Sequence, residues 1–178
     1  MSHTTMQEYS IRCLTPLLLM VLAAAAMPLA ADDTVQEKTR EKAEPVMLDV
    51  YKSPTCGCCK VWIDHLEERG FRTKIHHPAD MDRVKKAYGV SPRYRSCHTA
   101  VSEDGYIFEG HIPAHIIKRF LDDSPEDAIG LTVPGMPVGS PGMESGDRFM
   151  PYQVLLIRES GAPEVYAEVR NREDQYQE

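Results

Sequence analysis

Three of the five cysteines in this sequence lie within four positions, in the segment Cys56-Gly57-Cys58-Cys59. Thiolate sulfur is a soft ligand that favours Cu(I) and zinc over hard cations. Three thiolates this close together are difficult to aim at one small tetrahedral ion, whereas sulfurs that bridge several Cu(I) ions need not converge on a single point. The spacing therefore favours a polynuclear copper-thiolate site over a single zinc ion.

The residues around this cluster predict a turn from a strand to a helix. Residues 46–51 form a short apolar run of strand length that ends at Ser53-Pro54. From residue 56 to residue 69 apolar side chains recur at helical spacing, and Gly70 follows as a C-terminal cap. The cysteines would then lie at a helix N-terminus, which favours the thiolate form at neutral pH.

The rest of the chain predicts an α/β fold. The elements expected after the first helix are a strand at 71–76, a helix between Asp80 and Gly89, a hairpin of 97–101 and 106–108 around an Asp-Gly turn, and a helix beginning at Pro113. The core order is therefore β-α-β-α-β-β-α. Residues 152–157 and 164–169 are β-prone runs that predict a C-terminal β-hairpin.

A long loop rich in Pro, Gly and Met is predicted at residues 124–150. This segment holds four prolines and five glycines, so no regular element is expected in it. A loop this long is typically a functional cover or a disordered segment. Two interpretations of its methionines are open. They could hold the loop against the core, or Met136 or Met143 could donate a thioether to Cu(I).

The first 31 residues have the layout of a secretory signal peptide. Arg12 precedes an apolar run, and two acidic residues follow that run directly after Ala31. Pro16 and Pro28 leave 11 residues between them, and spanning a bilayer needs about 20. We therefore predict that residues 1–31 are a cleaved signal peptide, that the mature protein is periplasmic, and that it keeps no stable membrane span.

Length, composition and charge indicate how the rest of the chain is organised. A length of 178 residues fits one globular domain, predicted at 46–170. The highly charged residues 32–45 predict a disordered spacer, and the polar residues 171–178 predict a disordered tail. The net charge is −7, so the chain lacks the basic surface that nucleic-acid binding requires.

The element order, with Cys-x-x-Cys at the first strand-to-helix turn, resembles the thioredoxin fold. On this resemblance Cys97-His98-Thr99 falls where thioredoxins carry their cis-proline loop, and Gly110-His111 follows the hairpin. These loops meet on one surface of that fold, so the resemblance implies that Cys97 lies beside the cysteine cluster. The cis-proline position is not proline here and Cys58 is an additional thiol, which argues against ordinary thiol-disulfide exchange.

Four separated motifs resemble a narrower group. They lie at residues 51–59, 96–100, 110–114 and 130–143. Together they are similar, over residues 46–157, to the small exported family of unknown function that includes the copper-resistance protein CopG. The resemblance implies a periplasmic copper-binding protein whose thioredoxin-like turn has become a metal site.

The resulting hypothesis is a protein that holds Cu(I), as one or several ions, and buffers it, relays it or changes its oxidation state. Other exported copper-handling proteins would be its partners. His98 and His111 would lie on the same surface, and imidazole also suits Cu(II). The predicted metal ligands are Cys56, Cys58, Cys59, Cys97, His111 and Met136.

Other uses of the same cysteines stay open. Four thiolates could equally hold tetrahedral zinc. In an oxidising compartment the cysteines could form two structural disulfides. They could also act in a thiol-disulfide oxidoreductase, with Cys56 as the attacking thiolate and Cys59 as the resolving one. A chaperone that only binds copper and passes it to a partner is a further alternative.

Overall fold

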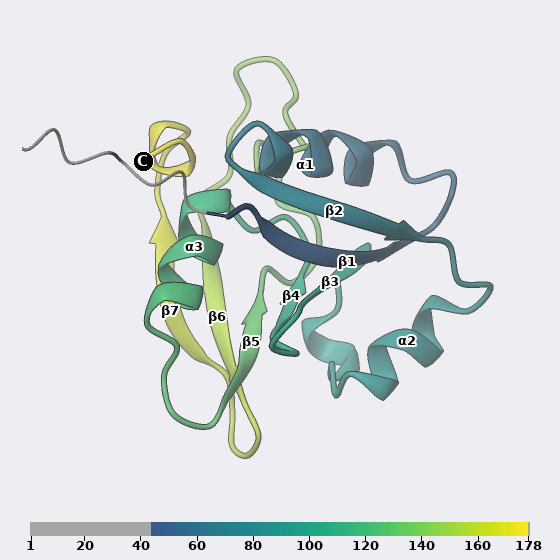
Figure 1. Ribbon diagram of the computed structural model, residues 1–178. Helices are drawn as coiled ribbons and strands as arrows, with labels where there is room; N and C mark the ends of the chain where they lie inside the picture. The colour runs from purple at the N-terminus through teal and green to yellow at the C-terminus, as the bar shows by residue number, and fades with distance from the viewer. Residues whose placement is uncertain (1–43, 178) are drawn as a thin grey trace, which may run out of the picture. The chain divides into compact units, whose positions relative to one another are not determined.

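The computed structural model describes residues 44–177 (Figure 1), and within them a seven-stranded sheet has the order β2-β1-β3-β4-β5-β6-β7. The strands are β1 Val46–Lys52, β2 Phe71–His76, β3 His98–Ser102, β4 Ile107–Glu109, β5 Ala128–Thr132, β6 Tyr152–Arg158 and β7 Glu164–Val169. The helices are α1 Gly57–Glu67, α2 Met81–Ala87 and α3 Ala114–Asp122, with short 3-10 helices η1 Pro92–Tyr94 and η2 Glu173–Gln175.

The predicted α/β class is confirmed, and so is the element order from β1 to α3. The predicted C-terminal hairpin is also present, as β6 and β7. Strand β2 runs parallel to β1, whereas β3 runs antiparallel to β1 and pairs Lys52 with His98. This register brings the end of β1 and the start of β3 to the same end of the sheet.

Helix α1 begins at the cysteine cluster because Cys56 acts as its N-cap. The Cys56 sulfur accepts the backbone N–H of Cys59 at 3.3 Å. The buried face of the helix includes Trp62 and Leu66, as the helical spacing predicts. The indole N–H of Trp62 donates to the carbonyl of Ile112 at 2.9 Å, which ties α1 to the segment that precedes α3.

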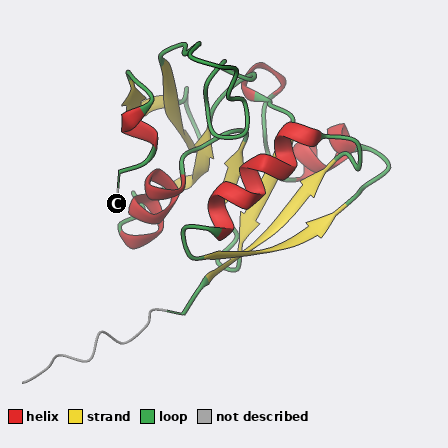
Figure 2. Cartoon of the chain, turned by 90° about the horizontal axis from the view of Figure 1, so that it is seen from above, coloured by secondary structure: helices red, strands yellow, loops and turns green. Residues whose placement is uncertain are grey.

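One hydrophobic core receives side chains from α1, α3 and the sheet. Helices lie against the strands in Figure 2. Trp62 of α1, Phe120 of α3 and Phe108 of β4 are fully buried and belong to the same cluster. In α2, by contrast, the buried residue is Lys85, a charged side chain.

The prediction that residues 124–150 contain no regular element is wrong, because β5 lies at Ala128–Thr132. It pairs parallel to β4 and antiparallel to β6. A Cβ on Gly130 would lie 1.9 Å from the carbonyl oxygen of Ile107, and its φ is +149°. The close passage of β5 along β4 therefore needs glycine, the same residue type that counted against a strand.

The predicted disordered tail at 171–178 is wrong for residues 171–177. This segment contains η2, and Gln175 is fully buried. Its side-chain amide nitrogen donates to the carbonyl of Gly139 at 2.9 Å, and its oxygen accepts from the Tyr152 hydroxyl at 2.8 Å. A polar side chain can be buried here because hydrogen bonds satisfy both ends of its amide.

The predicted signal peptide at 1–31 and nearly all of the predicted spacer at 32–45 lie outside the described residues. Among residues 44–177, no helix has both the length and the apolar character needed to cross a membrane.

His65 joins α1 to α3 and makes this contact sensitive to pH. Its Nε2 atom accepts the backbone N–H of Ala114, the first residue of α3, at 3.1 Å. Burial, reinforced by the charges of Arg69 and His115, lowers the pKa of His65 to about 3. The ring therefore stays neutral in the fold, while in the unfolded chain a histidine takes up a proton near pH 6.5. The stability that depends on neutral His65 is thus present above about pH 6.5 and is lost progressively below it.

We expect His65→Gln to reduce the loss of stability in acid. One such histidine accounts for about 2 kcal/mol of unfolding free energy between about pH 6.5 and about pH 5. Glutamine does not titrate and keeps an oxygen that can accept the Ala114 N–H. Urea unfolding of wild type and variant at both pH values measures the difference. A variant that loses stability as steeply as wild type contradicts this role for His65.

Candidate metal site

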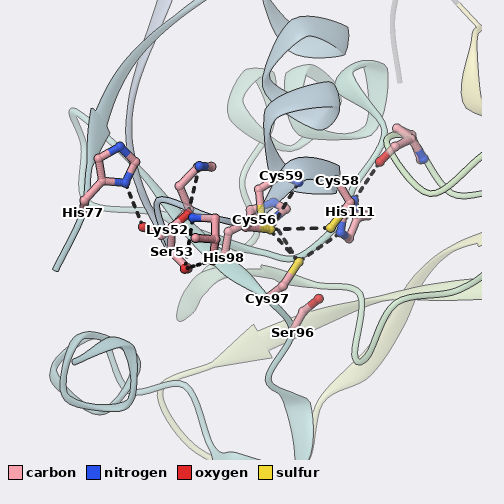
Figure 3. The surroundings of a disulfide bond; sticks show 12 residues. Lys52, Ser53, Cys56, Cys58, Cys59, His77, Ser96, Cys97, His98 and His111 are labelled. Carbon is pink, nitrogen blue, oxygen red and sulfur yellow. Dashed lines mark hydrogen bonds between the residues drawn. A yellow bond between two sulfur atoms is a disulfide. The ribbon is translucent and has the colours of Figure 1, made fainter. Parts of the chain in front are cut away.

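The four cysteines of the described residues meet at one place, as Figure 3 shows. The Sγ atoms of Cys56, Cys58, Cys59 and Cys97 all lie within 4.8 Å of one another. Cys56 and Cys59 form a disulfide. The Cys58 sulfur lies 3.5 Å from that of Cys56, and the Cys97 sulfur lies 3.6 Å from that of Cys59. The structure thus brings Cys97 together with the cluster, as the resemblance to thioredoxins implied.

The turn after β1 is held by one carbonyl group. The backbone oxygen of Ser53 accepts the N–H of Cys56 at 3.1 Å and the ammonium of Lys52 at 2.9 Å. Lys52 is itself buried and pairs with His98 across the β1-β3 ladder. The end of β1, the helix tip and the start of β3 are therefore connected directly beneath the sulfur atoms.

Two buried histidines face the Cys97 sulfur. It lies 3.0 Å from Nε2 of His111 and 3.4 Å from Nδ1 of His98. These three residues form a second group whose ligand atoms lie within 4.8 Å of one another. Nδ1 of His111 contacts the carbonyl oxygen of Pro141 at 2.7 Å. A carbonyl only accepts, so this contact assigns the proton to Nδ1 and leaves the lone pair of Nε2 facing Cys97.

Burial keeps this group of ligands uncharged. It raises the pKa of the Cys97 thiol to about 12, and the neighbouring Cys58 adds to the rise. It also lowers the pKa of His111, and it holds the pKa of His98 well below the usual range. The thiol and both imidazoles are therefore neutral near pH 7. A metal ion that binds Cys97 must displace its proton, so metal binding is coupled to proton release.

Met136 does not enter the buried group. Its side chain is 51% exposed, whereas His98 and His111 are fully buried. The preceding residue, Gly135, donates its N–H to the carbonyl of Arg95 at 3.1 Å, so Met136 lies near the segment that carries Cys97. The structure thus places this predicted ligand on the surface beside the site.

Residues 133–151, which follow β5 and are called the covering loop here, lie against His111 and the first turn of α1. The carbonyl of Pro141 reaches His111, and the next residue, Gly142, lies against the first turn of α1. A Cβ on Gly142 would lie 2.5 Å from the carbonyl oxygen of Cys58 and 2.8 Å from the backbone nitrogen of Trp62. Pro141 is not among the predicted site residues, because a backbone carbonyl leaves no signal in residue type.

The fold and the site define a mixed α/β protein with a cluster of soft sulfur ligands at a strand-to-helix turn. Residues 94–143 match the family described as protein of unknown function, DUF411. Two solved structures, both named copper resistance protein CopG, are 48% identical to the chain and cover 71% of it. Form 2 has a TM-score of 0.67 and is covered over 99% of its length, and Form 1 has a TM-score of 0.66 and is covered over 98%.

No curated protein matches the chain. The family match spans Cys97, His111 and most of the covering loop, and the structural matches extend over nearly the whole of each CopG chain. This chain belongs to the DUF411 family, which includes the copper resistance protein CopG. The resemblance found in the sequence is therefore confirmed.

The contact of Gly142 with α1 predicts the effect of adding a methyl group. Gly142→Ala would place its Cβ against backbone atoms that cannot move aside, at a φ of +85°. Gly146→Ala is the matched control, since its φ is also positive, at +57°, and no heavy atom lies within 4 Å of its Cβ position. We expect a loss of about 1 kcal/mol of unfolding free energy for the control and about 2–4 kcal/mol for Gly142→Ala.

Urea unfolding followed by the fluorescence of the single tryptophan, Trp62, measures both variants, and Trp62 itself lies at the contact. Equal losses in the two variants would show that the loop does not lie on α1 as described.

Proposed function

We propose that this protein binds Cu(I) through Cys56, Cys58, Cys59 and Cys97 in a polynuclear thiolate site, and that it acts in copper resistance. The observation that carries the proposal is the placement of four cysteine sulfurs within 4.8 Å of one another, from two distant stretches of chain. Soft sulfur ligands favour Cu(I), and the 48% identity to two proteins named copper resistance protein CopG supports copper as the metal.

The geometry of the helix tip supports bridging sulfurs. Cys58 and Cys59 are adjacent residues in the first turn of α1, and adjacent side chains of a helix do not face each other. Accordingly Cys59 is buried and Cys58 is half-buried. Because these two side chains leave the helix in different directions, aiming all four sulfurs at one ion is more demanding than letting them bridge several Cu(I) ions. His111, whose Nε2 lone pair faces Cys97, would add a nitrogen ligand.

The disulfide between Cys56 and Cys59 makes metal binding depend on the oxidation state of the protein. Closing it removes two electrons and two thiols from the site, so four sulfur ligands require the reduced form. Met136 is left out of the resident ligands because half of its surface is exposed. We further infer that the protein acts in the periplasm, since residues 1–31 have the layout of a signal peptide and copper resistance is the function named for its relatives.

A thiol-disulfide oxidoreductase is the second candidate, and the disulfide itself favours it. Cys56 is half-buried while Cys59 is fully buried, so an incoming thiolate would reach Cys56 more readily. Two measurements distinguish these functions: the copper content of protein purified from copper-fed cells, and the insulin-reduction activity of the metal-free protein. Retained copper with weak reductase activity supports the copper proposal, and full reductase activity without retained copper supports the alternative.

Cys97→Ser distinguishes the two functions within one variant. A hydroxyl is a poor ligand for Cu(I), so we expect the copper content of the reduced protein to fall by half or more. Thiol-disulfide exchange between Cys56 and Cys59 does not use Cys97, so any insulin reduction should be largely retained. Metal analysis per chain and the reduction rate are the two measurements. An unchanged copper content in this variant would remove Cys97 from the ligand set.

A further inference from the structure

A buried ion pair lies beneath the segment that carries Cys97. Lys85 of α2 and Glu109 of β4 are 4% and 0% exposed, and the ammonium nitrogen lies 2.6 Å from Oε1 of the carboxylate. The same oxygen accepts the backbone N–H of Ser96 at 2.6 Å, and the other oxygen accepts the hydroxyl of Thr99 at 2.6 Å. One carboxylate therefore connects α2, β3, β4 and the residue that precedes Cys97.

Stability alone is a weak explanation for such a pair. Removing two charges from water is costly, and replacing a buried pair by apolar residues of similar size is often neutral or stabilising. We therefore look for the role of the Lys85–Glu109 pair in the chain segments that it holds in place. Its hydrogen bond to the Ser96 N–H is the one that reaches the proposed site, because Cys97 is the next residue.

The Cys97 segment depends on a few contacts of this kind. It lies between η1 and β3 and belongs to no helix or strand. The Ser96 backbone is held on one side by Glu109. On the other side the Ser96 hydroxyl donates to the carbonyl of Gly135. Between these two contacts, the direction of the next side chain places the Cys97 sulfur 3.6 Å from that of Cys59.

Glu109 also leads directly to the histidine of the site. It is the last residue of β4, and His111 follows two positions later. The intervening Gly110 donates its N–H to the carbonyl of His98 at 3.1 Å. The two ligands that do not come from α1, Cys97 and His111, are therefore held by one short connected unit with Glu109 at its centre.

We infer that the Lys85–Glu109 pair is a positioning element of the copper site, which directs Cys97 toward the sulfurs of α1 through the Ser96 N–H. This inference rests on the proposed function, since it assigns Cys97 a place among the ligands. Neither Lys85 nor Glu109 contacts the metal in this role. Hydrogen-bonded groups behind metal ligands typically change metal affinity by about 10- to 100-fold when they are lost.

Two double variants test the inference. Lys85→Met with Glu109→Leu removes both charges and the acceptor for the Ser96 N–H. Lys85→Met with Glu109→Gln removes the charges but keeps an oxygen that can accept this N–H. We expect both to fold, the first to bind Cu(I) about 10- to 100-fold more weakly, and the second to recover most of the wild-type affinity.

The measurements are competition for Cu(I) with a chromophoric chelator, the number of sulfur neighbours per copper from X-ray absorption, and thermal unfolding of the reduced metal-free protein. A purely structural role would change unfolding without lowering the number of sulfur neighbours in folded protein. The inference is overturned if the Leu variant has the Cu(I) affinity and the number of sulfur neighbours of wild type. It is also overturned if the Gln variant loses as much Cu(I) affinity as the Leu variant.

A metal-free measurement separates this inference from the proposed function. The azo oxidant diamide takes two electrons and two protons from a pair of thiols and leaves a disulfide. With Cys56 and Cys59 already joined, it can couple Cys58 to Cys97, whose sulfurs lie within 4.8 Å. We expect coupling, detected by peptide mass spectrometry, to be slower in the Leu variant than in wild type. If wild type binds no copper yet this difference holds, the proposed function fails and the positioning role stands.

Ser96→Pro provides the test if the Leu variant does not fold. Proline removes both the N–H that Glu109 accepts and the hydroxyl that donates to Gly135. Arg95, with ψ of 149°, already has the extended conformation that a following proline requires. Ser96→Ala is its matched control, because it removes the hydroxyl contact to Gly135 and keeps the N–H. A greater loss of Cu(I) affinity in Ser96→Pro supports the inference, and equal affinities in the two variants overturn it.

Discussion

The antiparallel pairing of β1 with β3 is the constraint on which the site depends. It sets Lys52 opposite His98, so the chain leaves β1 toward Cys56 at the same end of the sheet where it enters β3 from Cys97. The sulfurs of residues 56 and 97 are 41 positions apart in the sequence and still share one small volume. A shift of β3 by one residue in this register would turn all of its side chains to the other face of the sheet and separate the two halves of the site.

Around this end of the sheet, several buried polar side chains are satisfied by hydrogen bonds, although Nε2 of His98 has no partner among the described residues. The imidazole of His111 binds the Pro141 carbonyl, Gln175 binds the Gly139 carbonyl, and the carboxylate of Glu109 binds an ammonium, a hydroxyl and an amide. Backbone carbonyls of the covering loop contact buried side chains, and its residues Val133 and Phe149 pack on the hydrophobic core. A segment with so many prolines and glycines can therefore have a defined position without regular structure.

Local pattern predicted most of the fold, while the site required more than local pattern. The helical spacing of Cys59, Trp62 and Leu66 and the Asp-Gly turn each carry a local signal, and both elements are present. The placement of Cys97 came only from resemblance, because no spacing rule joins residues so far apart. Strand β5 was missed because Gly130 was counted as a breaker, although it permits a close approach there. The buried Lys85–Glu109 pair could not be predicted either, since charged residues are ordinarily exposed.

The additional cysteine changes what the Cys-x-x-Cys turn can do. In a Cys-x-x-Cys turn with no other thiol, closing the disulfide would leave no sulfur for a metal. Here Cys58 and Cys97 stay free when Cys56 and Cys59 are joined, and both remain half-buried near His111. Oxidation therefore lowers the number of free thiols in the cluster from four to two rather than to none. A sulfur bonded in the disulfide is no longer available as a thiolate, so the oxidation state of Cys56 and Cys59 determines how many thiols the cluster offers, while Cys58 and Cys97 are free thiols in the oxidised form.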